Sequence, residues 1–347
     1  MLKINMFSTA DKVKGQGVGS AYVELVKMLR SHFNGQFKIT INDYGHRADI
    51  SHYHTINPSF YMSTFLPGRG KKIGYVHFLP ETLEGSLKIP QPFRGLFYKY
   101  VIAFYKRMDH IVVVNPTFIP KLVAYGIDEQ KITYIPNFVD PKSFYPVDSD
   151  QKQALRKQYG YSSDAFMVLG SGQIQTRKGV LDFIKLAQDN PDVQFVWTGG
   201  FSFGKMTAGY AELERVVQNP PANLSFPGIV PRDKIVDYYN MADLFLLPSY
   251  NELFPMSVLE AFSTHTPVML RNLTLYESII DGYYVPTSNE SDMNDQLHRL
   301  IIDHDALLDL QQRSKKAAQR YSEDHLAQTW YDFYTKQAKD KRYVSKK

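Results

Sequence analysis

The sequence predicts an α/β protein of two domains, each built on a parallel β-sheet that helices cover. Short apolar runs typical of buried strands alternate along the chain with segments of helical periodicity, and this alternation indicates parallel sheets. The length of 347 residues is sufficient for two such domains, each with its own core. The hydrophobic content of 44% fits a globular protein, and no run of about 18 apolar residues exists that would span a bilayer.

The first domain is expected to cover residues 1–140. Alternating strand and helix patterns fill it, so ligands are expected at the carboxyl ends of its strands. Its expected strands are 3–8, 37–42, 49–54, 72–77, 110–115 and 131–136, and its expected helices are 20–31, 58–66, 93–107 and 116–125.

A polar stretch, 141–164, is expected to connect the domains. It contains Asp148-Ser149-Asp150, which has the letters of a metal-binding Asp-x-Asp motif but does not lie at a strand end, so we expect helix capping or solvent exposure. The second domain is expected over 165–322, followed by a C-terminal helix with a basic tail over 323–347. Strands are expected at 165–170, 193–200 and 244–247, and helices at 180–188, at 233–241 and after Ser291, a suitable N-cap.

The residue types offer little for a metal ion. Cysteine is absent, which excludes disulfides and thiolate metal sites and fits a reducing cytoplasm. His52 and His54 stand on one face of an expected strand, but a third ligand at a suitable spacing is missing. We therefore expect no metal site.

The stretch from Pro248 to Phe262 carries the strongest functional signal. A buried strand ends at Pro248 and a helix begins near Pro255, so the free N–H groups and positive dipole end of the helix can bind an anion. Glu252 lies in the loop and Glu260 in the helix, and ionised carboxylates accept hydrogen bonds from sugar hydroxyls. This combination predicts a nucleotide-sugar site; an ordinary strand–loop–helix unit with two surface glutamates is the alternative.

Two further segments are suited to phosphate. Arg177 and Lys178 directly precede an expected helix, where plain surface cations would oppose the helix dipole, so a diphosphate partner is favoured. In the first domain, the glycines from Gly15 to Gly19 follow a strand and allow backbone N–H groups to approach a phosphate. This second signal is weak, because Ser20 occupies the place of the third glycine of the dinucleotide fingerprint.

The first half of the chain is basic. Up to Asp140 it has 17 Lys/Arg against 10 Asp/Glu, whereas the rest has 23 against 25. This asymmetry suggests an anionic membrane surface, with a scattered solubilising surface as the alternative; nucleic acid fits poorly, because the basic excess coincides with aromatic residues on one helix. In helix 93–107 we expect Phe93, Leu96, Phe97, Tyr100, Val101 and Phe104 to pack on the sheet, and we assign membrane or acceptor contact to Arg94, Phe97, Tyr98, Lys99, Tyr105, Lys106 and Arg107.

The spacing around Glu252 and Glu260 resembles the signature of the retaining GT-B glycosyltransferases of family 4. In order, the signature is a strand, Pro-Ser, a glutamate, seven residues, Glu-Ala, and then Thr266-Pro267-Val268. The resemblance covers nearly the whole chain and is most specific from Gly170 to Asn272. It implies two Rossmann-like domains facing a cleft, with the donor mainly on the second domain and the final helix returning to the first.

The resemblance also implies roles for single residues. His77, at a strand end, would contact the transferred sugar together with Glu252, with a purely structural histidine as the alternative. Gln173 takes the place that an arginine usually has, so Arg177 and Lys178 would carry the charge that meets the donor phosphates. The implied catalytic residues are His77, Glu252, Arg177 and Lys178, and the implied donor-binding residues are Gly17, Gln173, Val230, Leu253, Phe254, Pro255, Met256 and Glu260.

Among family members, the chain resembles bacterial glycolipid synthases of the diacylglycerol type. This likeness is carried by the segment from Met6 to Asp11, the glycine-rich stretch, the aromatic-basic helix 93–107 and Gln173. It implies transfer of a hexose from UDP-glucose or UDP-galactose to a glycolipid such as monoglucosyldiacylglycerol, with an α-linked product, no cofactor or metal, and a peripheral place on the cytoplasmic face of the bacterial membrane. A soluble family-4 glycosyltransferase for polysaccharide or protein, a UDP-sugar epimerase and a non-catalytic GT-B partner subunit are the alternatives.

Overall fold

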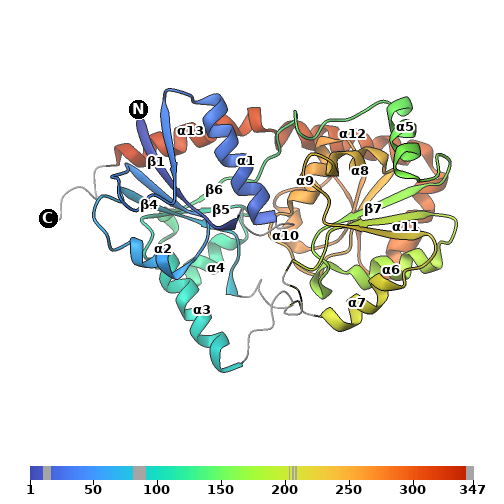
Figure 1. The fold of residues 1–347 in the computed structure, drawn as a ribbon, viewed down its shortest axis with the longest axis horizontal. Coiled ribbons are helices and arrows are strands. Elements are labelled where there is room, and N and C mark those ends of the chain that lie inside the picture. Colours follow the sequence, from blue (N-terminus) through green and yellow to red (C-terminus); the bar gives the residue numbers. More distant parts are fainter. Residues whose placement is uncertain (11–16, 81–90, 203, 205–206, 208, 341–347) are drawn as a thin grey trace.

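The protein has two six-stranded sheets, each covered by helices on its faces (Figure 1). The computed structural model describes residues 1–10, 17–80, 91–202, 204, 207 and 209–340. The first sheet has the order β2-β1-β3-β4-β5-β6 and the second β12-β11-β10-β7-β8-β9, and all their neighbouring strands are parallel. The strands are β1 (Leu2–Phe7), β2 (Phe37–Ile41), β3 (Ile50–Tyr53), β4 (Lys71–Val76), β5 (His110–Val113), β6 (Ile132–Tyr134), β7 (Met167–Ser171), β8 (Gln194–Thr198), β9 (Leu224–Gly228), β10 (Leu244–Leu247), β11 (Val268–Arg271) and β12 (Val285–Thr287).

Helices connect most successive strands, as parallel pairing favours, whereas β2 and β3 are joined by a loop, 42–49. This arrangement confirms the predicted α/β class with two Rossmann-like domains. The α-helices are α1 (Gly17–His32), α2 (Pro58–Ser63), α3 (Gln91–Lys106), α4 (Phe118–Ala124), α5 (Ser149–Tyr159), α6 (Val180–Asp189), α7 (Tyr210–Gln218), α8 (Ile235–Met241), α9 (Met256–Ser263), α10 (Thr274–Glu277), α11 (Glu290–Ile302), α12 (His304–Arg320) and α13 (Glu323–Lys339).

β10, in the interior of the second sheet, is a continuous apolar run because helices bury both of its faces. All four residues of β10 are fully buried. In β7, a side chain at Gly170 would clash with the neighbouring sheet residue, since a Cβ there would lie 2.3 Å from the Trp197 ring. Tight packing of this kind holds the strand ends, and therefore the loops that follow them, in fixed positions.

The chain crosses between the two domains twice, and the two crossings are hydrogen-bonded to each other. Val139 N donates to Tyr321 O (3.1 Å), and Glu323 N donates to Val139 O (3.1 Å). After the second crossing, α13 packs against α1 and β3 of the first domain (Figure 1), where Tyr334 is hydrogen-bonded to His52 (2.7 Å). The last helix therefore belongs to the packing of the first domain.

The stretch 141–164 is more ordered than a simple connection. About half of it is α5, which packs against α8 and is held there by the ion pairs of Lys152 (2.7 Å) and Arg156 (2.6 Å) with Asp243. Asp148 caps α5 by accepting a hydrogen bond from Gln151 N (2.9 Å), which is the capping role expected of the Asp-x-Asp letters. This half of the stretch is thus part of the second domain.

One expected helix start is wrong. Asn289, not Ser291, caps α11, because its side chain accepts from Asp292 N (3.0 Å) while Ser291 lies in the first turn. Both residue types are good caps, and single-sequence patterns do not separate neighbouring candidates.

Candidate active site

A cleft of about 1160 Å³ lies between the carboxyl ends of the two sheets. It is lined by loops that follow β4, β7, β8 and β10, which is where parallel sheets place their ligands. All twelve residues expected to be catalytic or to bind the donor line this cleft: Gly17, His77, Gln173, Arg177, Lys178, Val230, Glu252, Leu253, Phe254, Pro255, Met256 and Glu260. Gly15 and Gln16 of the glycine-rich stretch lie outside the described residues.

The loop between β10 and α9 presents a helix N-terminus to the cleft. Pro255 is the N-cap of α9, and no side chain caps the helix there, so its first N–H groups remain available to a ligand. Two asparagines of the first domain hold this loop: Asn115 donates to Leu253 O (3.1 Å), and Asn137 donates to Phe254 O (3.1 Å). Sequence patterns missed both, because their partners lie more than a hundred residues away.

Lys178 and Glu252 form a buried ion pair at the centre of the cleft wall. Lys178 Nζ lies 2.5 Å from Glu252 Oε1, and an Arg177 guanidinium nitrogen lies 3.4 Å from the same oxygen. Arg177 also donates to Asn251 O. Gly179 makes this approach feasible: its φ is +68°, and a Cβ there would lie 2.2 Å from Pro248 O. The two cations that the sequence placed near phosphate are therefore held against the Glu252 loop.

The surroundings set the ionisation of this pair. Burial alone would raise the pKa of Glu252, but Lys178 and Arg177 bring it below its ordinary value. Burial lowers the pKa of Lys178, and the opposing effect of Glu252 limits this shift. A donor diphosphate would add negative charge beside Lys178 and favour its protonated form.

Glu260, the expected ribose ligand, is fixed by two neighbours. Its Oε1 accepts from Arg232 (2.8 Å) and its Oε2 from the Tyr239 hydroxyl (2.8 Å). Arg232 also lines the cleft. Sequence analysis missed it, because a single arginine after Pro231 has no distinctive local pattern.

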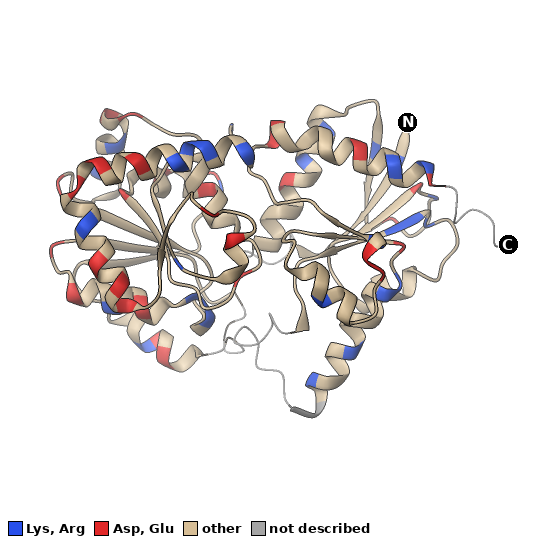
Figure 2. Ribbon diagram, turned by 180° about the vertical axis from the view of Figure 1, so that it is seen from behind, with Lys and Arg blue, Asp and Glu red and all other residues tan. Residues whose placement is uncertain are grey.

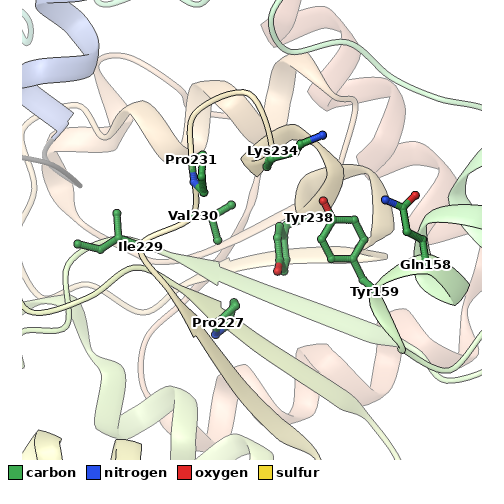
Figure 3. A pocket seen from close by; sticks show the side chains of 8 residues that line it. All are labelled: Gln158, Tyr159, Pro227, Ile229, Val230, Pro231, Lys234 and Tyr238. Atoms are coloured by element: carbon green, nitrogen blue, oxygen red, sulfur yellow. The ribbon is translucent and has the colours of Figure 1, made fainter.

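Val230 lies on a loop that borders two pockets. Ile229, Val230 and Pro231 line both the main cleft and a smaller pocket of about 350 Å³. Figure 3 shows this smaller pocket, which Val230 lines together with Tyr159 and Tyr238, whose rings meet edge to face with centroids 5.1 Å apart. Val230 therefore borders the main cleft, where the sequence predicted a donor-binding role, and also the smaller pocket.

His77 lies in a row of three buried histidines with neighbouring rings. Its ring lies 5.8 Å from that of His54, which lies 4.2 Å from that of His52. Burial lowers the pKa of His77 and of His52 to about 3, and it holds the pKa of His54 well below its ordinary value. All three imidazoles are therefore neutral near pH 7, and His77 can donate or accept a hydrogen bond without adding charge.

These histidines are expected to make the protein acid-sensitive. In the unfolded chain each takes up a proton as the pH falls below its ordinary pKa of 6.5, whereas in the folded chain His52 and His77 stay neutral until about pH 3 and the pKa of His54 is also held well below 6.5 by burial. Stability is therefore full above pH 6.5 and falls as the pH drops through this window. Each histidine should lower the free energy of unfolding by about 1 kcal/mol between pH 7 and about pH 5.5.

Urea unfolding at several pH values measures this effect. His54→Asn should reduce the slope of stability against pH, because the buried imidazole is replaced by a side chain that does not titrate. A slope that His54→Asn does not alter would contradict the buried, neutral state of this histidine.

A cluster of carboxylates lies where the domains join. Within the described residues, Glu24, Asp140 and Glu323 are the group whose ligand atoms lie close enough, within 4.8 Å of one another, to hold a metal ion. Each already has a basic partner in this protein, so the cluster is explained as an ion-pair network. The pairs are Glu24–Arg232 (2.5 Å), Asp140–Lys27 (2.5 Å) and Glu323–His32 (2.9 Å).

The residues assigned to membrane contact do not form one surface. The assignment of Tyr105 to membrane contact is wrong, because the residue is 2% exposed and its hydroxyl donates a hydrogen bond to Phe78 O (2.9 Å). Arg107 is not a free outer cation either, since it donates to Thr64 O (3.0 Å) and lies over the Phe65 ring (4.0 Å). Phe97 instead lines the cleft.

The expected packing of Phe93 and Leu96 on the sheet is also wrong. They are 63% and 69% exposed, because the N-terminal half of α3 extends away from the sheet (Figure 1). In Figure 2, α3 carries basic bands and no acidic one, in accordance with its residues Arg94, Lys99 and Lys106. On neighbouring α2 and the residues after it, Met62, Phe65 and Leu66 are also exposed. None of the helices in the described part of the chain has the length and hydropathy of a bilayer-spanning segment.

Comparisons with solved structures identify the architecture. The Anabaena protein HepE, solved with UDP and glucose, matches 96% of this chain and 100% of its own, with a TM-score of 0.77 at 15% identity. A sucrose-phosphate synthase from Thermosynechococcus elongatus matches 97% and 99% of the two chains, with a TM-score of 0.79 at 16% identity. At this identity the likeness concerns the fold, and it confirms the predicted GT-B arrangement.

Comparisons of sequence identify the family. Residues 151–321 match the model of the glycosyl transferases group 1, and residues 16–143 match that of glycosyltransferase family 4. The alpha-galactosylglucosyldiacylglycerol synthase of Streptococcus pneumoniae is 50% identical over 97% of this chain and 90% of its own. The processive diacylglycerol alpha-glucosyltransferase of Acholeplasma laidlawii is 29% identical over 57% and 61%. The chain therefore belongs to the group 1, family 4 glycosyltransferases, and it is an enzyme of that class.

Proposed function

We propose that this enzyme transfers galactose or glucose from a UDP-sugar to a hydroxyl of monoglucosyldiacylglycerol, with retention, and so forms an α-linked diglycosyldiacylglycerol. The observation that carries the proposal is the 50% identity, along 97% of the chain, with a synthase whose name describes this product class. The cleft supports it, since it combines a helix N-terminus and two cations with carboxylates suited to hydroxyl groups.

The roles of the residues follow from their positions in the cleft. Arg177, Lys178 and the N-terminus of α9 would stabilise the negative charge that grows on the departing UDP. Glu252 and neutral His77 would bind the hydroxyls of the transferred sugar. The transition state would resemble an oxocarbenium ion, and the leaving phosphate would take the proton of the acceptor hydroxyl.

In this proposal the donor needs no metal ion. The diphosphate charge is met by Arg177 and Lys178, so transfer should persist in excess EDTA. The test is to supply UDP-galactose and UDP-glucose separately with monoglucosyldiacylglycerol and EDTA, and to determine the anomeric configuration of the product by NMR. An α-linked product from one donor supports the proposal, whereas a β-linked product, or activity that EDTA abolishes, contradicts it.

We also propose that the first domain contacts an anionic membrane surface peripherally, on the cytoplasmic side. We call the contact region the α2–α3 surface and define it by the exposed apolar residues and by the cations of α3. Apolar side chains beside cations, with no acidic residue on the helix, suit the headgroup region of anionic lipid. Its residues are Met62, Phe65, Leu66, Phe93, Arg94, Leu96, Lys99 and Lys106.

A further inference from the structure

Arg232 contacts carboxylates of both domains across the cleft. One guanidinium nitrogen lies 2.5 Å from Glu24 Oε1 on α1, and the other lies 2.8 Å from Glu260 Oε1 on α9. Glu24 belongs to the first domain and Glu260 to the second. The same guanidinium also donates to Ser20 Oγ (3.3 Å), next to the glycines that begin α1.

The burial of the two carboxylates strengthens these contacts. The side chains of Glu24 and Glu260 are 3% and 7% exposed, and that of Arg232 is 34% exposed on the wall of the cleft. Charge-assisted hydrogen bonds in such surroundings are little screened by solvent. A planar guanidinium can donate to two carboxylates at once in a fixed geometry, whereas a lysine ammonium lacks this fork.

The contacts of Glu260 leave room for a ligand. A carboxylate oxygen can accept two hydrogen bonds, and each oxygen of Glu260 has one donor here, Arg232 for Oε1 and Tyr239 for Oε2. The remaining lone pairs can accept from the two hydroxyls of a ribose. Arg232 and Tyr239 therefore fix the plane of the carboxylate before the donor arrives, which lowers the entropy that binding costs.

We propose that Arg232 is a positioning residue that orients Glu260 toward the ribose of the donor and ties this carboxylate to α1 of the first domain. The proposal rests on the proposed function, because it takes Glu260 as the ribose ligand. It means that donor affinity depends on Glu24, a buried residue that does not line the cleft. Removing either contact of Arg232 should weaken binding of the donor and leave binding of the acceptor unchanged.

The test measures UDP affinity by calorimetry and donor KM by activity. Arg232→Ala should weaken UDP binding at least tenfold and raise the donor KM, with the acceptor KM unchanged. Arg232→Lys should restore only part of the affinity. Glu24→Gln should weaken UDP several-fold in the parent background but not in the Arg232→Ala background, since it acts through Arg232. Combining Arg232→Ala with Glu260→Ala should cost no more than the worse single variant.

Lys27→Ala is the matched control. Lys27 lies on the same helix as Glu24 and forms a 2.5 Å ion pair with Asp140, but it does not line the cleft. It should bind UDP within twofold of the parent, and thermal melting identifies any variant that has lost its fold. The inference is overturned if folded Arg232→Ala and Arg232→Lys bind UDP within twofold of the parent. It is also overturned if the losses from Arg232→Ala and Glu260→Ala add, or if Glu24→Gln behaves like the control.

The failure of the proposed function is distinguishable from this outcome. If the parent protein itself does not bind UDP, the donor assignment is wrong as a whole. If the parent binds UDP and the Arg232 and Glu24 variants bind it equally well, the donor site is correct but Arg232 does not position Glu260.

Discussion

Replacing Lys178 with alanine is expected to lower kcat/KM by roughly 10²–10³-fold, the range for losing one group that stabilises transition-state charge. The variant removes the cation closest to Glu252 and leaves that carboxylate facing the donor phosphates. It should still fold, because Arg177 remains 3.4 Å from Glu252 and continues to compensate its charge. Transfer of labelled hexose, measured at several donor concentrations, gives the effect.

Lys185→Ala provides the control for this prediction. Lys185 forms an ion pair of the same length with Asp189 (2.5 Å), but on the outer, exposed side of α6. An exposed pair of this kind contributes little, so activity should be within twofold of the parent. Glu252→Gln should be as inactive as Lys178→Ala. Near-normal transfer by either cleft variant, with a normal melting temperature, would remove the pair from the mechanism.

Replacing Met62, Phe65, Phe93 and Leu96 together with serine should weaken binding to anionic vesicles at least tenfold. The four side chains are 56–69% exposed, and burying an apolar side chain in lipid contributes about 1.5–3 kcal/mol when burial is complete. UDP affinity should be unchanged, since none of the four lines the cleft. Vesicle flotation at several lipid concentrations measures the first quantity and calorimetry the second.

Two further variants separate the contributions to membrane binding. Lys99→Ala with Lys106→Ala should reduce binding to anionic vesicles several-fold and leave the weak binding to neutral vesicles unaltered, because each cation near anionic lipid contributes about 1 kcal/mol. Ile302→Ser is the apolar control, since Ile302 is 84% exposed but lies on α11 in the second domain. Equal vesicle binding by the parent and the quadruple variant would show that the α2–α3 surface is not the contact.

Local sequence signals predicted a nucleotide-sugar site at a strand end, and the resemblance to the family 4 enzymes implied the cleft between two domains. The end of the β10 strand at Pro248, the helix start at Pro255 and the two glutamates are features of one short stretch, and parallel topology places them at a strand end. The cations at Arg177 and Lys178 were predicted in the same way. These residues line one cleft because β7 and β10 are neighbours in the sheet, so that the loops after them lie close together.

Residues that act through distant partners could not be predicted. Arg232, Asn115 and Asn137 show no local pattern, and the contacts described above for them join segments 28 to 212 residues apart. The periodicity of apolar residues correctly predicted the helix α3, but it does not show which part of a helix extends beyond the edge of the sheet. Phe93 and Leu96 are therefore exposed, and Tyr105, expected outside, is buried next to Phe104 in the core of the first domain.

Transfer of labelled hexose to competing acceptors tests the central claim most directly. The parent protein would receive one UDP-hexose at a time, with monoglucosyldiacylglycerol in anionic vesicles and a soluble oligosaccharide in the same reaction. The account predicts label in a diglycosyldiacylglycerol, formed faster in anionic than in neutral vesicles. Label in the oligosaccharide alone would be consistent with the donor-binding role of the cleft. It would contradict both the glycolipid acceptor and the α2–α3 surface as a membrane contact.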